Sequence, residues 1–410
     1  MWCNDRVHGI AHVSQTTSRF LNTVSGGELR RRWHAVRAAM RERGIDVLVL
    51  QNSSDWVGGY IRWFTNEPAT NGYPSSVVFP LEEGMSVIEQ GPFNQTRECD
   101  ETEVRDTGIA RRLTTPNYPS VYYTGGYDAE IAACEVRRMG AKCMGLVAPA
   151  AMYHSFGKRL LELLANEISI VDATDLVDRI KAIKSAEERD LIRSVAAMQD
   201  QVMAGVRERI RPGLKDFEIA AYAQYLSQQL GSEQGIFLCS SARPGQAASF
   251  RPRFMQGRKL EKGDIYSLLV ECNGAGGFYA ELSRIFVLGR APAELREAQA
   301  AVVEAQSKAL ALLEPGASCR DIFEEHNAYL RSCGLPEERR LSMHGMGYDM
   351  VERPLIRQDE DMRLEEHMTI VCHPGILTER LFAHNTDVYM IERHGPSACL
   401  HRTPKEIMEL

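Results

Sequence analysis

Residues 277–286 read GFYAELSRIF, and this stretch carries the clearest structural signal in the chain. Its apolar and aromatic side chains predict a buried strand that follows a glycine turn. One acid, Glu281, stands between Ala280 and Leu282 inside this apolar strand. Burial of a carboxylate is costly unless the group is paired or catalytic, so Glu281 is a candidate site residue. An ion pair with Arg284 is the structural alternative.

The pattern of helices and strands changes near residue 180. The first part alternates short strands with helices, which predicts an α/β domain. Its strand patterns lie at 45–51, 75–79, 85–89 and 142–147. The second part opens with Ser185 and Glu188, a capping box that predicts a long helix over 185–210, followed by antiparallel strands between long helices. The expected units are an arm at 1–25, an α/β domain at 26–180 and an α+β domain at 181–410.

Composition narrows the class of protein. A net charge of −7 over 410 residues argues against a nucleic-acid-binding protein, which needs a basic surface. The longest apolar runs, such as 47–50, are too short to cross a bilayer. The N-terminus lacks a signal-peptide pattern, and the ten cysteines form no CxxC pair, which indicates reduced thiols. We therefore expect a cytoplasmic protein that acts on a small molecule, with no nucleic acid or membrane as partner.

Six ordered segments of the chain resemble the creatinase/prolidase family, the aminopeptidase P/creatinase superfamily known as M24. Each segment alone is a weak signal, but their order and spacing make the resemblance specific. The segments are IKSAEE (183–188), KGD (262–264), GFYAELSRIF (277–286), LEPG (313–316), HGMGY with ERP (344–348 and 352–354), and MTIVCHPG (368–375). The resemblance implies a pita-bread catalytic domain after the α/β domain. It also implies a homodimer, in which the first domain of one subunit leans over the pocket of its partner.

Peptidases of this family hold two divalent ions through two Asp, one His and two Glu, and the present chain departs from that set. The His is unchanged as His344. The second Asp is replaced by Glu281, and the first Glu is replaced by His373. The second Glu falls near Asn385, with Asp387 two residues further on. The resemblance therefore implies a re-purposed site without the intact dinuclear centre, and a single divalent metal stays open.

The position of the first Asp is occupied by Val270, eleven residues before Glu281, and Glu271 lies one residue further on. Neighbouring residues of a strand point to opposite faces of the sheet. We therefore expect Glu271 to reach the site only if the register shifts, and Asn273 with Gly274 offers a place for a bulge.

The candidate catalytic residues share ionisable side chains at positions that match the family motifs. They are His344, His373, Glu271, Glu281 and Glu352. Two neighbouring histidines can divide the roles of acid and base near neutral pH. A hydrogen-bonded structural histidine is the alternative for each, and a turn salt bridge is the alternative for Glu352.

The candidate substrate-binding residues are Arg62, Phe64, Arg251 and Arg253. Arg62 and Phe64 belong to the aromatic segment 56–64, which the resemblance places over the pocket of the partner subunit. The two other arginines lie in a loop that borders the pocket in the family, where a guanidinium can fork a carboxylate. Core packing and a solvated basic loop are the respective alternatives.

Three functions remain open at this point. The leading hypothesis is a creatinase-like hydrolase or lyase that cleaves a C–N or similar bond of a small anionic metabolite. His344 and His373 exchange protons in that hypothesis, while Glu271 and Glu281 orient the substrate. The alternatives are a metal-dependent Xaa-Pro dipeptidase or aminopeptidase with unusual ligands, and a non-catalytic binding protein on the same fold.

Overall fold

The computed structural model describes residues 24–52, 59–67, 72–100 and 107–410. The predicted arm at 1–25 lies outside this part of the chain except for its last two residues, and so does the start of the aromatic segment, 56–58. Among the described residues, no helix is long and apolar enough to cross a membrane.

The first part contains a mixed seven-stranded sheet with the order β4-β5-β3-β2-β1-β6-β7. Strand β1 pairs antiparallel with β2 and parallel with β6, which places it at the centre of the sheet. The strands are β1 Val47–Asn52, β2 Ser75–Pro80, β3 Met85–Gln90, β4 Gln95–Glu98, β5 Ile109–Thr115, β6 Cys143–Val147 and β7 Ser169–Asp172. The four predicted strands are confirmed, whereas β4, β5 and β7 were missed because they carry many polar side chains.

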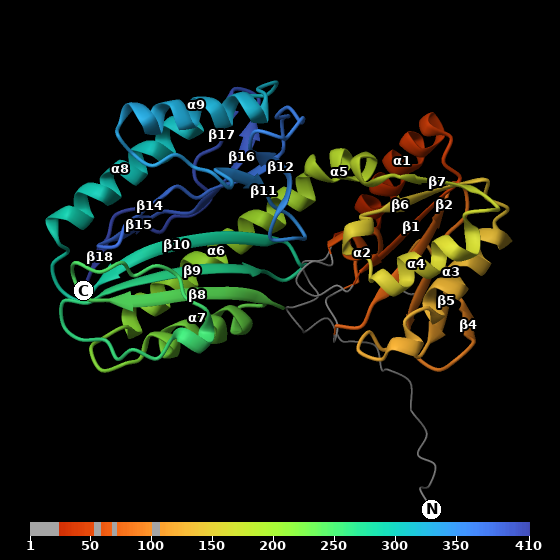
Figure 1. Ribbon diagram of the computed structural model, residues 1–410, viewed down its shortest axis with the longest axis horizontal. Helices are drawn as coiled ribbons and strands as arrows, with labels where there is room; N and C mark the ends of the chain where they lie inside the picture. Colours follow the sequence, from red (N-terminus) through yellow and green to blue (C-terminus); the bar gives the residue numbers. More distant parts are fainter. Residues whose placement is uncertain (1–23, 53–58, 68–71, 101–106) are drawn as a thin grey trace, which may run out of the picture.

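Helices cover both faces of this sheet (Figure 1). Leu48 and Leu50 pack into the same apolar cluster as Trp33 of α1, while Val47 and Val49 pack with the residues of α3 and α4. This alternation follows from the two-residue period of a strand. The helices are α1 Gly26–Arg43, α2 Gly59–Thr65, α3 Tyr127–Arg138, α4 His154–Leu164 and α5 Thr174–Ala182, with short 3-10 turns η3 Tyr122–Thr124 and η4 Pro149–Ala151.

The second part begins with the predicted long helix. Ser185 and Glu188 form the complete capping box at the start of α6. Helices α6 and α7 pack on a four-stranded sheet with the order β18-β10-β9-β8. These elements are α6 Ala186–Arg209, α7 Asp216–Gln229, β8 Gly235–Ala242, η5 Arg253–Met255, β9 Ile265–Asn273, β10 Tyr279–Val287 and β18 Met408–Glu409.

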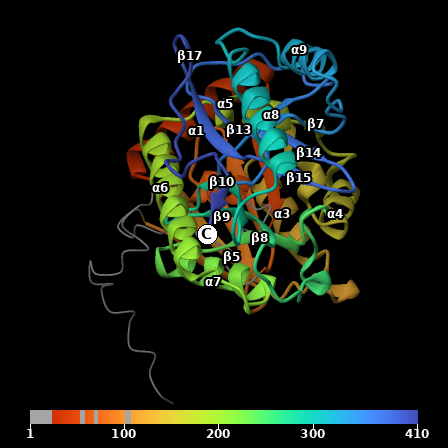
Figure 2. The ribbon, with the colours of Figure 1, turned by 90° about the vertical axis from the view of Figure 1, so that its left-hand side faces the viewer.

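A second helix pair covers a five-stranded sheet with the order β12-β11-β13-β16-β17 and a small β14-β15 hairpin. Figure 2 shows α6 and α8 on opposite sides of the strands. The elements are α8 Ala293–Leu310, α9 Cys319–Ser332, β11 Met343–Gly345, β12 Glu352–Ile356, β13 Thr369–Cys372, β14 Gly375–Leu377, β15 Phe382–His384, β16 Asp387–Glu392 and β17 Gly395–Pro396. The expected sequence of an α/β part and an α+β part is therefore confirmed.

Candidate active site

Two carboxylates face each other on neighbouring strands. Glu271 of β9 and Glu281 of β10 are direct partners in the antiparallel register, and both side chains are buried. The pairing is regular along both strands, from Asn273 opposite Tyr279 onward. The expectation that Glu271 needs a bulge was therefore wrong. The turn at 274–278 sets a register that places both acids on one face of the sheet.

The environment separates the protonation of these two acids. Burial, together with the negative charge of Glu281, raises the pKa of Glu271 well above its usual range. Burial alone would also raise the pKa of Glu281, but its interactions with His344 and His373 hold that pKa below the ordinary value. The surroundings therefore favour the protonated form of Glu271 and the ionised form of Glu281. Such a split is typical of acid and base roles.

His344 on β11 presents one ring nitrogen to Glu281. Its Nδ1 donates to the Gly345 carbonyl at 2.9 Å, since a carbonyl oxygen can only accept. Its Nε2 lies 3.5 Å from Oε2 of Glu281. Nε2 is therefore the ring nitrogen that faces the site, and a proton on it is stabilised by the Glu281 carboxylate.

His373 follows the last residue of β13 and completes the cluster. The rings of His344 and His373 lie 5.2 Å apart between centroids. Burial and the neighbouring His344 lower the pKa of His373 to about 4, so its ring is neutral near pH 7. His373 is half-buried whereas His344 is buried, which makes His373 the histidine nearer to solvent. We call Glu271, Glu281, His344 and His373 the four-residue cluster.

Arg340 is a cation beside this cluster that the sequence analysis missed. Its positive charge lowers the pKa of Glu271, Glu281 and His373. Its backbone N–H donates to Glu338 at 2.6 Å, but its exposed guanidinium has no hydrogen bond or ion pair with any residue that the structure describes. The residue stands in a loop without a motif, so its only signal in the sequence was its place four residues before His344.

Tyr279 is a second residue that the sequence analysis did not assign to the site. It lies two residues before Glu281 on β10, so the two side chains share one face of the sheet. Its hydroxyl is buried and has no hydrogen-bond partner within the described ranges. A buried polar atom without a partner calls for an explanation, and a substrate or water in the site would provide one.

Glu352 belongs to a different group of residues from the four-residue cluster. Its carboxylate lies 2.6 Å from Lys181 and 2.9 Å from Lys184, and all three side chains are buried. Lys181 also lies 3.1 Å from Asp349, which accepts the backbone N–H of Gly59 at 2.9 Å. The predicted catalytic role and the exposed-turn alternative both give way to a buried ion pair, because Lys181 near the end of α5 and Lys184 just after this helix face the carboxylate. We call Lys181, Lys184, Asp349 and Glu352 the ion cluster.

The structure also gives Arg62 and Phe64 contacts that differ from the expected substrate-binding roles. The Arg62 guanidinium donates to Glu233 of its own chain at 3.0 Å and is only 4% exposed. Phe64 is completely buried and makes edge contacts with Trp63 and Phe79 at 5.2 and 5.1 Å. Phe64 therefore stabilises the core, and the charge of Arg62 is occupied within the chain rather than offered to a substrate.

Arg251 and Arg253 do not reach the cluster in any contact between described residues. Arg253 is exposed and donates to Gln224 at 3.1 Å, and Arg251 is exposed beside β8. Phe250 of the same loop packs its ring against His384 at 4.9 Å. The expected substrate-binding role of these two arginines therefore has no contact with the cluster to support it, and Arg340 is the arginine whose charge acts there.

The residues present do not fit a dinuclear metal centre. At the position of the second Glu, the Asn385 amide donates to Asp387 at 2.6 Å and is itself neutral. The other oxygen of Asp387 accepts from the buried Arg284 at 2.7 Å, which neutralises its charge. Glu281, His344 and His373 offer one carboxylate and two imidazoles, a donor set that suits a single transition metal by its chemistry. Their ligand atoms do not all lie within 4.8 Å of one another in the described part of the chain.

A second group with metal-ligating side chains lies behind the cluster. Ligand atoms of Asp387, Cys399 and His401 lie within 4.8 Å of one another. The Arg284 guanidinium already pairs with Asp387, and Lys405 lies 3.7 Å from it. The positive charges of Arg284 and Lys405 beside this carboxylate disfavour the binding of a metal cation, so we assign no metal to this group.

Comparison with known proteins places these observations in a family context. Residues 190–393 match the model of metallopeptidase family M24. The Xaa-Pro dipeptidase of Pyrococcus furiosus is 25% identical over 237 residues, which are 57% of this chain and 67% of that protein. The crystal structure of an X-Pro aminopeptidase from Thermotoga maritima superposes with a TM-score of 0.74 at 18% identity, covering 92% of this chain and 99% of that one. A Xaa-Pro dipeptidase from Bacillus anthracis gives 0.73 at 19% identity, covering 93% and 100%. The predicted pita-bread fold of the second part is thereby confirmed.

Proposed function

Because the chain belongs to the creatinase/prolidase superfamily, with a domain of metallopeptidase family M24 in its second half, we propose that it is a hydrolase. Its substrate is a small anionic metabolite, in which it cleaves a non-peptide C–N bond. The observation that carries this proposal is the four-residue cluster, in which two buried carboxyl groups face each other on neighbouring strands beside two imidazole rings.

The cluster can perform each proton transfer that hydrolysis needs. His344 Nε2 accepts a proton from a water molecule as its oxygen bonds to the substrate carbon, and Glu281 stabilises the imidazolium. Glu271 donates its proton to the nitrogen as the C–N bond breaks, and becomes ionised. His373 then carries the proton from His344 back towards Glu271 or to solvent. The roles of the four residues follow from their protonation states and contacts.

An anionic substrate is supported by the unpaired guanidinium of Arg340. Because its positive charge acts on the cluster and has no ion pair within the described chain, a carboxylate or phosphate of the substrate would supply one. The neighbouring Arg339 is also exposed, and its charge is not among the causes that shift the pKa of Glu271, Glu281 or His373. Arg339 is therefore a matched control for Arg340.

Replacement of Arg340 by Met is expected to raise KM for an anionic substrate about tenfold or more, because a charge-assisted hydrogen bond is lost. KM for an uncharged analogue should stay unchanged, and Arg339→Met should change neither value. Steady-state kinetics on both substrates tests this. Equal effects of the two substitutions would contradict the assignment of Arg340.

A metal-dependent Xaa-Pro dipeptidase is the second candidate, favoured by the names of the relatives. In that case Glu281, His344 and His373 would hold one divalent ion, which supplies Lewis-acid activation of water when bound. A thermal-shift screen of guanidino and amino-acid metabolites and Xaa-Pro dipeptides, with and without Mn²⁺, Co²⁺ or Zn²⁺, separates the candidates, since a bound ligand raises the unfolding temperature.

Metal analysis gives the matching prediction. Protein purified without chelators is expected to contain at most one equivalent of transition metal per chain, since a neutral amide, Asn385, stands at the position of the second Glu and Asp387 is already paired with Arg284. Elemental analysis by mass spectrometry measures this number. Two equivalents, both retained after dialysis, would exclude the metal-free reaction and the one-ion site together.

A further inference from the structure

A cavity of about 200 Å³ lies next to the four-residue cluster, between the helix pair α8-α9 and the β14 strand. Its walls are mainly apolar. They include Val302 and Ala305 of α8, Leu330 of α9, Leu335 and Pro336 of the following loop, and Ile376 with Leu377 of β14. A dry cavity of about 150 Å³ is large enough to hold a benzene ring, so this one accommodates a six-membered ring with a substituent.

One polar side chain inside this cavity has no partner. His326 is only 4% exposed, and neither of its ring nitrogens has a hydrogen bond with any residue that the structure describes. Its Nδ1 is fully enclosed, so Nε2 is the nitrogen that can meet a ligand. Burial lowers the pKa of His326, so the ring is neutral near pH 7. A buried nitrogen without a partner costs free energy unless a ligand or water hydrogen-bonds to it.

The cavity walls are held in place without a ligand. Asn327 of α9 donates to the Glu338 carbonyl at 3.0 Å and accepts its N–H at 2.8 Å, which fixes the 335–338 loop against the helix. Glu337 and Glu338 add negative charge to the lining, which opposes an anionic ligand. The shape and charge therefore select a neutral molecule with an apolar body.

We propose that this cavity is a second binding site, for a small neutral molecule with an apolar ring-sized body and one hydroxyl or similar group that hydrogen-bonds to His326. The site is separate from the four-residue cluster and from the guanidinium of Arg340. Its occupant would touch Ser342 and Pro374, which lie two residues before His344 and directly after His373. The proposal does not depend on the reaction, because it concerns binding alone.

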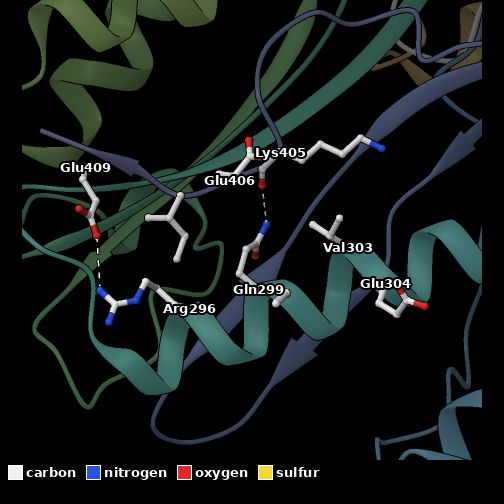
Figure 3. A pocket seen from close by; sticks show the side chains of 9 residues that line it. Arg296, Gln299, Val303, Glu304, Lys405, Glu406 and Glu409 are labelled. Atoms are coloured by element: carbon white, nitrogen blue, oxygen red, sulfur yellow. Dashed lines mark hydrogen bonds and ion pairs between the residues drawn. The ribbon is translucent and has the colours of Figure 1, made fainter.

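The opposite face of α8 provides a control surface. Figure 3 shows a groove there, in which Gln299 donates to the Lys405 carbonyl at 3.0 Å and Arg296 lies 3.7 Å from Glu409. Ala300 borders that groove and is exposed, whereas Ala305 on the same helix is buried against the cavity. The same substitution at both positions therefore distinguishes the cavity from the groove.

Phenol is a suitable probe, since it combines a ring with one hydroxyl. Titration calorimetry on the full chain is expected to show one phenol per chain, about tenfold weaker binding in His326→Leu, and no binding of benzoate at the same concentrations. Ala305→Leu fills the cavity and should abolish phenol binding, whereas Ala300→Leu should leave it unchanged.

A second filling variant, Leu335→Trp, protects the test against misfolding, because Leu335 lies in a partly exposed loop. Circular dichroism and the unfolding temperature verify that each variant is folded. The proposal is overturned if phenol does not bind, if it binds equally to both folded filling variants, or if benzoate binds as tightly. A His344 variant that loses turnover but still binds phenol would test only the proposed reaction. The proposed function and the proposed second binding site can therefore be contradicted independently of each other.

Discussion

The His344→Ala variant is expected to lose about 10²- to 10⁴-fold in kcat, the usual contribution of a positioned general base. The Nε2 of His344 is the nitrogen that faces Glu281, while its Nδ1 is held by the Gly345 carbonyl. Alanine removes the proton acceptor and leaves Glu281 ionised in a buried place without its partner. The substrate identified in the thermal-shift screen is used for steady-state kinetics.

His373→Ala belongs to the same experiment and should lower kcat as well, since His373 links the cluster to solvent. His34→Ala, on the exposed face of α1, is the control and should behave like the wild type. If His344→Ala is correctly folded and keeps more than about a tenth of the wild-type kcat, His344 is not the general base.

The Glu352→Gln variant is expected to lose about 3–5 kcal/mol of unfolding free energy, because one partner of a buried ion cluster is removed. The buried ammonium group of Lys184 would lose its carboxylate partner, and the Lys181 carbonyl would be its remaining hydrogen-bond partner among the described residues. Urea unfolding at pH 7 measures the change. Glu304→Gln, which removes the exposed partner of Lys308, should change stability by about 1 kcal/mol or less.

The pH dependence of this effect follows from the pKa of Glu352. Burial would raise it, but the two lysines lower it from 4.5 to about 2. A carboxyl group whose pKa is lower in the folded than in the unfolded protein stabilises the fold at pH values above its unfolded-state pKa. This contribution to stability is lost as the pH falls through its folded-state pKa. The stability difference between wild type and Glu352→Gln should therefore narrow as the pH is lowered from 4.5 towards 2. A difference that stays constant over this range would show that Glu352 is not the ionised partner.

Local signals in the sequence predicted much of the fold. The capping box of Ser185 and Glu188 begins α6, and Gly44 ends α1 in the left-handed conformation with φ 64°. These features depend on residues within one helical turn, so the sequence contains them completely. The polar strands β4, β5 and β7 were missed because only their pairing with neighbouring strands defines them.

The motifs predicted which ionisable side chains lie close together, whereas residues outside the motifs were missed. Glu281 and His344 come together as the motifs indicated, and His373 joins them. Arg340 was missed because its role depends on the course of a loop that carries no motif. Phe64 was assigned to a substrate because a short aromatic segment does not show which of its side chains face the core.

By itself, the sequence determined the chain's superfamily, the order of its helices and main strands, and the identity of three ionisable side chains that the fold brings together. The tertiary structure alone decided that Glu271 faces Glu281 and that Glu352 faces Lys181 and Lys184. Strand register and ion-pair partners depend on contacts between residues far apart in the chain, or on the length of a turn. The periodicity of a single segment contains neither.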